Sequence, residues 1–212
     1  MVLELDRVTV SINNTPLFDP VTLRVEPGQV TTVMGPSGCG KSTLLAAIVG
    51  DLNPVFSLQG DVRLDDQSVL TLPMQRRRIG LLYQDDLLFP HMNVGQNLGF
   101  ALASSLPRRE RLARVEEYLA LAGLEGYAER DVASLSGGQR ARVSLLRTLM
   151  AEPRAVLLDE PFSKLDTAMR DQFRDWVFST LQERAVPALQ VTHDKEDCGD
   201  GPVYLIQEGR FA

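Results

Sequence analysis

A glycine-rich segment is the strongest chemical feature of the sequence. Residues 35–43 read GPSGCGKST and match G-x-x-x-x-G-K-[ST] at Gly35, Gly40, Lys41 and Ser42. Glycines let a backbone wrap around phosphate oxygens, the lysine reaches the β- and γ-phosphates, and the serine hydroxyl ligates Mg²⁺. The pattern predicts a phosphate-binding loop (P-loop) for a nucleoside triphosphate, with a chance glycine-rich turn as the alternative. Nucleotide contacts are expected from the whole run: Gly35, Pro36, Ser37, Gly38, Cys39, Gly40, Lys41, Ser42 and Thr43.

Two adjacent carboxylates form a second candidate site. Asp159 and Glu160 follow four apolar residues in the run AVLLDE at 155–160. A buried parallel strand would deliver them at its C-terminal end, where open α/β sheets bind ligands. Asp159 is then placed to hold Mg²⁺ through water, and Glu160 to orient or deprotonate an attacking water. A strand followed by a solvated acidic turn is the alternative, and the upstream P-loop favours the catalytic interpretation.

The signature segment LSGGQ (residues 135–139) predicts a second helix start that can hold an anion. Ser136 is a typical N-cap residue, and Gly137 and Gly138 let the helix end approach a phosphate without interference from Cβ atoms. The chain therefore carries two predicted phosphate-binding helix ends, about a hundred residues apart.

The P-loop and the paired carboxylates lie at the boundaries of predicted strands and helices. The P-loop follows an apolar run at 30–34 and precedes a helix that ends at about Gly50 with the glycine of a C-cap. The remaining predicted strands are 2–10, 21–25, 61–64, 79–83, 155–159, 188–192 and 203–207, and a further helix is predicted at about 165–185.

Residues 93–151 interrupt this alternation of strands and helices with consecutive predicted helices. The clearest covers 108–122 and places Leu112, Val115, Leu119 and Ala122 on one apolar stripe. The pattern favours an α/β core with an inserted helical subdomain.

Composition excludes several classes of protein. The 212 residues suffice for one domain, and the net charge of −6 argues against a nucleic-acid partner, which requires a basic face. No run approaches the roughly 20 apolar residues of a membrane-spanning helix, and the N-terminal residues alternate rather than forming a signal peptide. With only two cysteines, Cys39 and Cys198, we expect an intracellular domain.

The motifs together resemble those of the ATP-binding cassette (ABC) ATPase family over nearly the whole chain. They occur in the family's order: the P-loop, Gln84, the signature segment, VLLDE, Ser163-Lys164-Leu165-Asp166 and His193. The resemblance implies a single ABC ATPase domain over 1–212, of the α/β class. Its P-loop NTPase core and antiparallel β-subdomain would take residues 1–84 and 152–212, and its helical subdomain about 85–151.

The resemblance also assigns roles to individual residues. Gln84 would contact Mg²⁺ or water and form a hinge to the helical subdomain, although a solitary glutamine is also common in a polar loop. His193 would contact the γ-phosphate, although a single histidine is more often structural. Asp166 would link two sites across a dimer. The family's adenine-stacking aromatic falls at Ile12 here, which puts base selectivity in question, and Phe18 is the nearest aromatic residue.

In the family, two cassettes pack head to tail around ATP and Mg²⁺. The resemblance implies that Ser136, Gly137, Gly138 and Gln139 bind the γ-phosphate held by Lys41 of a second copy. Within the family, the sequence is most similar to import-type subunits. This similarity implies that the chain works with integral membrane permease subunits and an extracytoplasmic solute-binding protein. It also implies a peripheral location on the cytoplasmic face of the inner membrane. A soluble ABC ATPase that is not coupled to transport, of the assembly type, is the alternative. The signature segment disfavours a P-loop kinase.

The apolar segment Leu87–Met92 follows Gln84. We expect it to line the groove that receives a helix of a permease, with packing inside the helical subdomain as the alternative.

Overall fold

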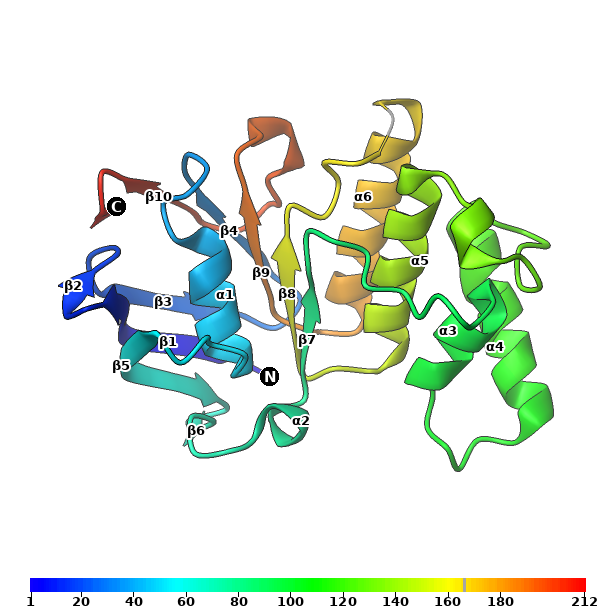
Figure 1. Ribbon diagram of the computed structural model, residues 1–212, viewed down its shortest axis with the longest axis horizontal. Coiled ribbons are helices and arrows are strands. Elements are labelled where there is room, and N and C mark those ends of the chain that lie inside the picture. Colours follow the sequence, from blue (N-terminus) through cyan, green and yellow to red (C-terminus); the bar gives the residue numbers. More distant parts are fainter. Residues whose placement is uncertain (166) are drawn as a thin grey trace. The chain divides into compact units, whose positions relative to one another are not determined.

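The computed structural model describes residues 1–165 and 167–212 and divides into two compact units (Figure 1). The first unit is Met1–Leu81, Arg154–Glu160 and Phe178–Ala212. The second is Leu82–Pro153 and Pro161–Val177. The expected helical subdomain at about 85–151 falls within the second unit, which also takes in Pro161–Val177.

The first unit contains two β-sheets. One is antiparallel, with the order β2-β1-β5-β6 and with β3 also paired to β1. The other has the order β11-β10-β4-β9-β8-β7, and its strands from β10 to β8 run parallel. The strands are β1 (Leu3–Ile12), β2 (Thr15–Pro16), β3 (Val21–Val25), β4 (Val30–Met34), β5 (Phe56–Leu64), β6 (Gln67–Ser68), β7 (Ile79–Leu82), β8 (Ala155–Asp159), β9 (Ala188–Thr192), β10 (Val203–Gln207) and β11 (Arg210–Phe211).

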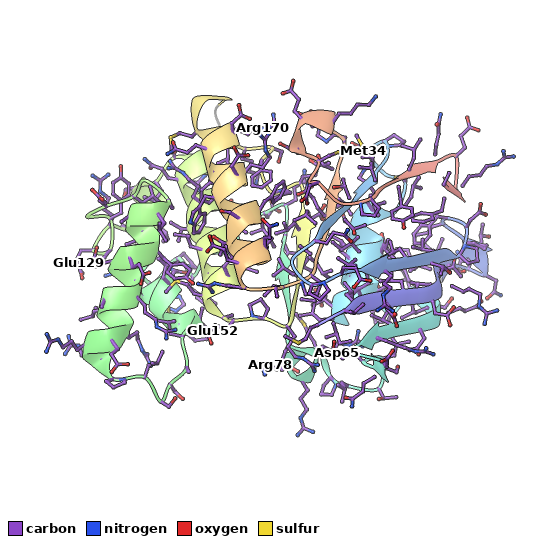
Figure 2. All side chains as sticks on the ribbon, turned by 180° about the vertical axis from the view of Figure 1, so that it is seen from behind. Met34, Asp65, Arg78, Glu129, Glu152 and Arg170 are labelled. Carbon is purple, nitrogen blue, oxygen red and sulfur yellow. The ribbon has the colours of Figure 1, made fainter. Side chains whose placement is uncertain are left out.

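The parallel strands bring three loops to one edge of the sheet. Strands β4, β8 and β9 are buried at every position, as expected for strands covered on both faces. Met34 pairs with Thr192 and Asp159 with Val191, so these strands end side by side. Figure 2 shows Met34 at the end of β4, from which the P-loop departs. The residues that follow all three strands therefore meet at this edge.

Helix α1 (Lys41–Val49) packs against both sheets of the first unit. Leu44, Leu45 and Ile48 are fully buried in an apolar cluster with side chains from β1, β3 and β8. Gly50 ends the helix in the left-handed conformation and donates its N–H to Ala46 O, as the sequence predicts. The unit also contains two short helices, α2 (Met74–Arg77) and η2 (Lys195–Asp197).

The second unit is helical. It comprises α3 (Val94–Ala101), α4 (Arg108–Leu121), η1 (Val132–Ser134) and α5 (Gly137–Met150), and α6 (Thr167–Glu183) continues from it into the first unit. Its interior includes Leu98, Leu119 and Leu145, each fully buried. Among the described residues, no helix combines the length and apolar character needed to cross a membrane.

Two predictions about these elements were wrong in detail. Leu112 does not lie on a buried stripe, because its exposed fraction is 53% while Val115 and Leu119 on the same helix are buried. Strand β5 begins at Phe56, earlier than the predicted strand at 61–64, because Phe56 to Gln59 pair with the end of β1. This long-range pairing extends a strand that has a weak local pattern.

Candidate active site

The P-loop connects β4 to α1, and its backbone requires glycine at three positions. Gly38 and Gly40 have φ angles of 81° and 97°, in the left-handed region that other residues rarely adopt. A Cβ atom at Gly35 would lie 2.5 Å from the backbone oxygen of Ile206, so no side chain fits there. The tip of the loop, Pro36–Gly38, is exposed, so a ligand can approach the N–H groups of Ser37 and Gly38.

Lys41 begins α1, and its side chain lies across the P-loop. Its Nζ donates hydrogen bonds to the carbonyl oxygens of Gly35 and Pro36 at 2.7 and 2.9 Å. The P-loop thus combines an ammonium group, the positive N-terminal end of α1 and close-packed glycines. Its residues suit a polyphosphate anion.

Phe18 supports the P-loop from inside the first unit. The residue is 1% exposed, and a Cβ atom at Gly40 would lie 3.0 Å from its ring. The Thr9 hydroxyl donates to Phe18 O at 2.8 Å and fixes this residue. Phe18, the aromatic residue nearest to Ile12 in sequence, is therefore buried and is not available to stack on a base.

Asp159 ends β8 with a carboxyl group that is mostly buried. Burial is the largest effect and raises the pKa of Asp159, and the charge of Glu160 raises it further. A hydrogen bond from the Ser42 hydroxyl and the charge of Lys41 oppose this rise. The P-loop serine and the strand-end carboxylate therefore lie together, as a metal site shared between them requires.

The donor set at Ser42 and Asp159 fits Mg²⁺. Both provide oxygen ligands, and Mg²⁺ prefers one or two protein oxygens together with water and substrate phosphates. No group of three or more His, Cys, Asp and Glu side chains that could hold a metal occurs in the described part of the chain.

Glu160 and His193 are in direct contact although they follow different strands. Nδ1 of His193 lies 2.9 Å from Oε1 of Glu160, whose side chain is 14% exposed. Glu160 has a φ of 48°, in the left-handed region, and its N–H donates to Val191 O at 3.0 Å. This conformation turns the chain out of the strand. It is uncommon for a glutamate, and such uncommon backbone conformations cluster at functional sites.

The signature segment starts α5, as the sequence predicts, and its polar side chains form a capping box. Ser136 Oγ accepts a hydrogen bond from Gln139 N at 3.3 Å, and Gln139 Oε1 accepts one from Ser136 N at 2.9 Å. Gln139 also donates to the Tyr127 hydroxyl at 3.2 Å. The spacing Ser-x-x-Gln could have indicated this reciprocal pair, which was not predicted. Around Gly137 there is room for a Cβ atom, with Arg140 Nη2 the nearest group at 3.9 Å.

The other predicted site residues are divided between the units. Gln84 is exposed and belongs, with the signature segment, to the second unit, whereas the P-loop, Asp159, Glu160 and His193 belong to the first. Asp166 lies outside the described residues.

Comparison with known proteins identifies the class to which this fold and these motifs belong. The family model for the ABC transporter matches residues 18–163. The chain therefore belongs to the ABC transporter family, as an ATPase subunit.

The chain is also similar to individual ATP-binding proteins of transporters. It is 50% identical over 190 residues to the ABC transporter ATP-binding protein YnjD of Escherichia coli K12, which covers 90% of this chain and 88% of YnjD. It is 38% identical to the Fe(3+) ions import ATP-binding protein FbpC of the same strain, covering 92% of this chain and 55% of FbpC. With the sulfate/thiosulfate import protein CysA of Gloeobacter violaceus it shares 41% identity over 97% of this chain and 60% of CysA. The chain thus spans little more than half of these two import proteins.

A solved structure agrees with the fold. The dimeric post-hydrolysis state of the ATP-binding cassette MJ0796, bound to ADP and Pi, superposes with a TM-score of 0.84 at 28% identity. The match covers 98% of this chain and 95% of MJ0796.

Proposed function

We propose that this ATPase drives the import of a solute through a membrane permease, and that two copies of the chain form its ATP sites. The contact of Glu160 with His193, beside the Asp159 and Ser42 pair, is the observation that carries the proposal. The Glu160 carboxylate, which can accept a proton, therefore lies at the same edge of the sheet as the P-loop. The relatives named for iron and sulfate import support the direction of transport.

The proposed site residues of this copy have distinct parts in hydrolysis. Lys41 and the P-loop amides hold the phosphates, and Ser42 and Asp159 would hold Mg²⁺, with Gln84 as a further contact. When bound, Mg²⁺ supplies neutralisation of phosphate charge. Glu160 accepts the proton of the water that attacks the γ-phosphate in line, and His193 fixes the Glu160 carboxylate and senses the γ-phosphate.

The second half of each site comes from the signature segment of the other copy. Its capping box presets the first turn of α5, whose N–H groups and positive end suit an anion. Ser136, Gly137, Gly138 and Gln139 bind the γ-phosphate held by the P-loop of the second copy. The room around Gly137 permits close approach of this ligand.

A trapped dimer tests the proposed site. Glu160→Gln keeps the side-chain shape but removes the base, so turnover should fall by roughly a hundredfold or more and ATP-bound dimers should accumulate. In a Cys198→Ala background, Ser136→Cys of one molecule should then cross-link to the native Cys39 in the P-loop of the other when ATP and a short thiol cross-linker are added. Undiminished turnover would exclude Glu160 from catalysis, and purely monomeric products would exclude the two-copy site.

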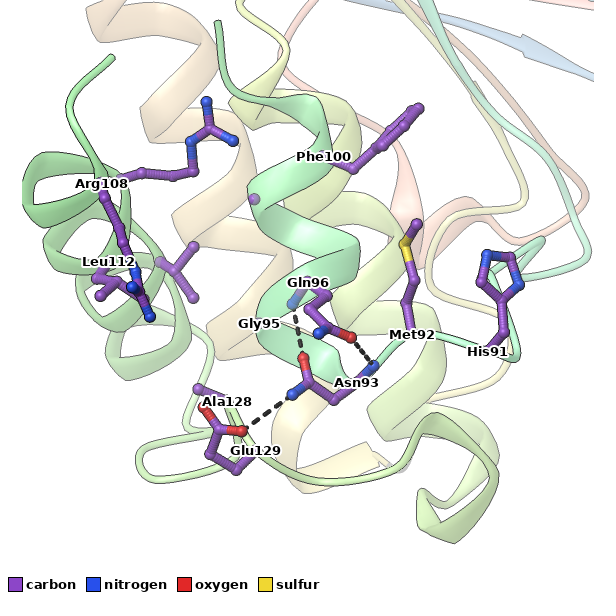
Figure 3. Close-up of a pocket in the computed structure, with 13 residues that line it drawn as sticks. His91, Met92, Asn93, Gly95, Gln96, Phe100, Arg108, Leu112, Ala128 and Glu129 are labelled. Carbon is purple, nitrogen blue, oxygen red and sulfur yellow. Dashed lines mark hydrogen bonds between the residues drawn. The ribbon is translucent and has the colours of Figure 1, made fainter. Parts of the chain in front are cut away.

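A groove in the second unit supports the permease partner. It has a volume of about 780 Å³ and is lined by Met92, Phe100 and Leu112, with Arg108 and Glu129 among its charged residues (Figure 3). Phe100 and Leu112 are 64% and 53% exposed. This combination of exposed apolar side chains with charged ones fits an amphipathic helix of a permease. The chain would then lie on the cytoplasmic face of the membrane, in a complex that includes a solute-binding protein on the other side.

The segment Leu87–Met92 contributes only partly to this groove. His91 and Met92 line it, whereas the ring of Phe89 packs edge-on against that of Phe100 with centroids 5.0 Å apart. The Asn97 side chain is fully buried and bonds both the N–H and the carbonyl of Phe89. The exposed lining residues are therefore better targets for testing docking than Phe89 itself.

A further inference from the structure

Arg140, one residue beyond the signature segment, joins three parts of the second unit. Its Nε donates to Asp86 Oδ2 at 3.0 Å, and its Nη1 donates to Leu135 O at 2.6 Å. Its Nη2 is the group nearest to the Cβ position of Gly137, at 3.9 Å. The guanidinium group therefore lies alongside the first turn of α5, between the signature segment and the loop that follows Gln84.

Two acidic residues follow Gln84 directly, and each pairs with a basic residue near the signature segment. Asp85 Oδ1 lies 3.5 Å from Lys164 Nζ, and the Asp85 side chain is 88% exposed. The Asp86 side chain is only 16% exposed, and that of Arg140 is 38% exposed. Solvent screens the first pair strongly and the second much less, so the Asp86 charge is the one that acts at the start of α5.

A carboxylate at this place has opposite effects on the helix and on the ligand. It interacts favourably with the positive N-terminal end of α5, but it repels a phosphate bound to the same helix end. The Arg140 guanidinium neutralises Asp86 at hydrogen-bonding distance. The first turn of α5 then stays attractive to an anion.

We propose that Arg140 is a positioning and charge-compensating residue that keeps the signature segment competent to bind the γ-phosphate by neutralising Asp86. The inference rests on the proposed two-copy site. It assigns to Arg140 the control of the electrostatic potential at the signature segment, which forms half of that site. A purely mechanical role, in which Arg140 only ties Leu135 to the loop after Gln84, makes different predictions for charge-preserving variants.

The role of Arg140 can be tested by measuring ATP-dependent dimerisation in a Glu160→Gln background. Analytical ultracentrifugation gives the dimer dissociation constant, and binding of labelled ATP at low protein concentration gives the affinity of the P-loop, which lies in the other unit. Arg140→Met should weaken dimerisation roughly tenfold while the P-loop affinity is unchanged. Arg114→Met is the control for losing an arginine–carboxylate pair in the same unit, because Arg114 donates to Glu152 at 2.9 Å and both of these side chains are exposed. It should leave both constants unchanged.

Charge-specific variants separate compensation from a mechanical link. Adding Asp86→Asn to Arg140→Met should restore dimerisation to within about threefold of the parent, and Asp86→Asn alone should equal or exceed the parent. Arg140→Lys, which retains the charge, should remain near the parent even if Arg140→Met folds poorly. Raising the salt concentration should narrow the gap between Arg140→Met and the parent.

Each contrary result has a separate meaning. A double variant as weak as Arg140→Met, a loss in Asp86→Asn, or an Arg140→Met variant that matches Arg114→Met would overturn the compensating role while the dimer stands. A parent that does not dimerise with ATP overturns the proposed two-copy site, and this role for Arg140 with it.

Discussion

Two neighbouring carboxylates acquire different properties because one ends a strand and the other leaves it. Asp159 is the last buried residue of β8, where burial raises its pKa, and it accepts a hydrogen bond from Ser42. Glu160 adopts a left-handed conformation that brings it to His193. A one-residue step in sequence thus separates a metal-binding carboxylate from a base in the proposed mechanism.

The raised pKa of Asp159 predicts a pH-dependent cost to stability. The folded chain holds the proton above the ordinary pKa of 3.8, so the ionised carboxylate destabilises the fold at neutral pH, and this cost disappears as pH falls through the raised pKa. Without nucleotide, Asp159→Asn should have a higher Tm than the wild type at about pH 7, and the difference should shrink as the pH is lowered toward about 4.

Asp61→Asn provides a control of opposite sign. A hydrogen bond from Ser68 is the main cause that lowers the pKa of Asp61, so this carboxylate stabilises the fold when ionised. Its replacement should lower the Tm at neutral pH, with the loss fading in acid. Equal Tm shifts for Asp159→Asn at every pH would contradict the predicted effect of burial.

The sequence identifies residues better than it identifies their contacts. The P-loop, Asp159, Glu160 and His193 carry local patterns that locate them in the chain. The 2.9 Å contact of Glu160 with His193 depends on the register in which Asp159 pairs with Val191, and no local pattern encodes that register. The same holds for the contact of Arg140 with Asp86.

At the scale of elements, α1 is fixed at both ends. Its start carries Lys41, and its end is held by Arg77, whose Nη1 donates to Ala47 O and Ile48 O at 3.2 and 2.8 Å. Nε of Arg77 also donates to Leu72 O at 3.1 Å. Because Arg77 is buried, it satisfies carbonyl groups that water cannot reach, and its charge favours the helix C-terminus.

Arg77→Met should therefore destabilise the first unit. We expect the free energy of unfolding to fall by about 2–4 kcal/mol, because several buried carbonyl groups lose their donor. Arg77→Lys should recover little, since an ammonium group lacks the planar fork that reaches these oxygens. Arg76→Met, at the adjacent exposed position, is the control and should change stability by less than about 0.5 kcal/mol in denaturant titrations. A loss for Arg77→Met no larger than that of the control would contradict this role.

Strand prediction succeeded where burial makes the pattern local. The predicted runs 30–34, 155–159, 188–192 and 203–207 are confirmed as β4, β8, β9 and β10, and the first three are buried at every position because both faces are covered. The two-residue strands β2, β6 and β11 were not predicted, because they exist only through hairpin pairing. The prediction that Leu112 is buried was wrong because the periodicity of a helix does not indicate how far along the helix its packing partner extends.

For the whole molecule, the groove of the second unit offers a test of its partner. Phe100→Asp combined with Leu112→Asp places charges on exposed apolar side chains, so the fold should persist while binding to the permease is lost. The measurement is co-purification with the permease from membranes, together with the ATPase rate of the isolated subunit, which should be unchanged. Leu121→Asp, at a leucine of α4 that is 50% exposed and outside the groove, is the control and should still co-purify. Full recovery of the permease with the double variant would exclude docking at this groove.

Because the ring of Phe18 packs against Gly40, a truncated or chimeric chain must keep this ring for the P-loop to retain its shape. Asp19 N donates to Gly209 O at 2.6 Å, so the support of the P-loop draws on segments near both termini. A fragment that begins at Val30 would retain the glycine-rich motif but would lack Phe18, which packs against it. Such a truncation should fail to retain ATP on a filter, whereas a chimera that exchanges the first strands but keeps a phenylalanine at this place should succeed.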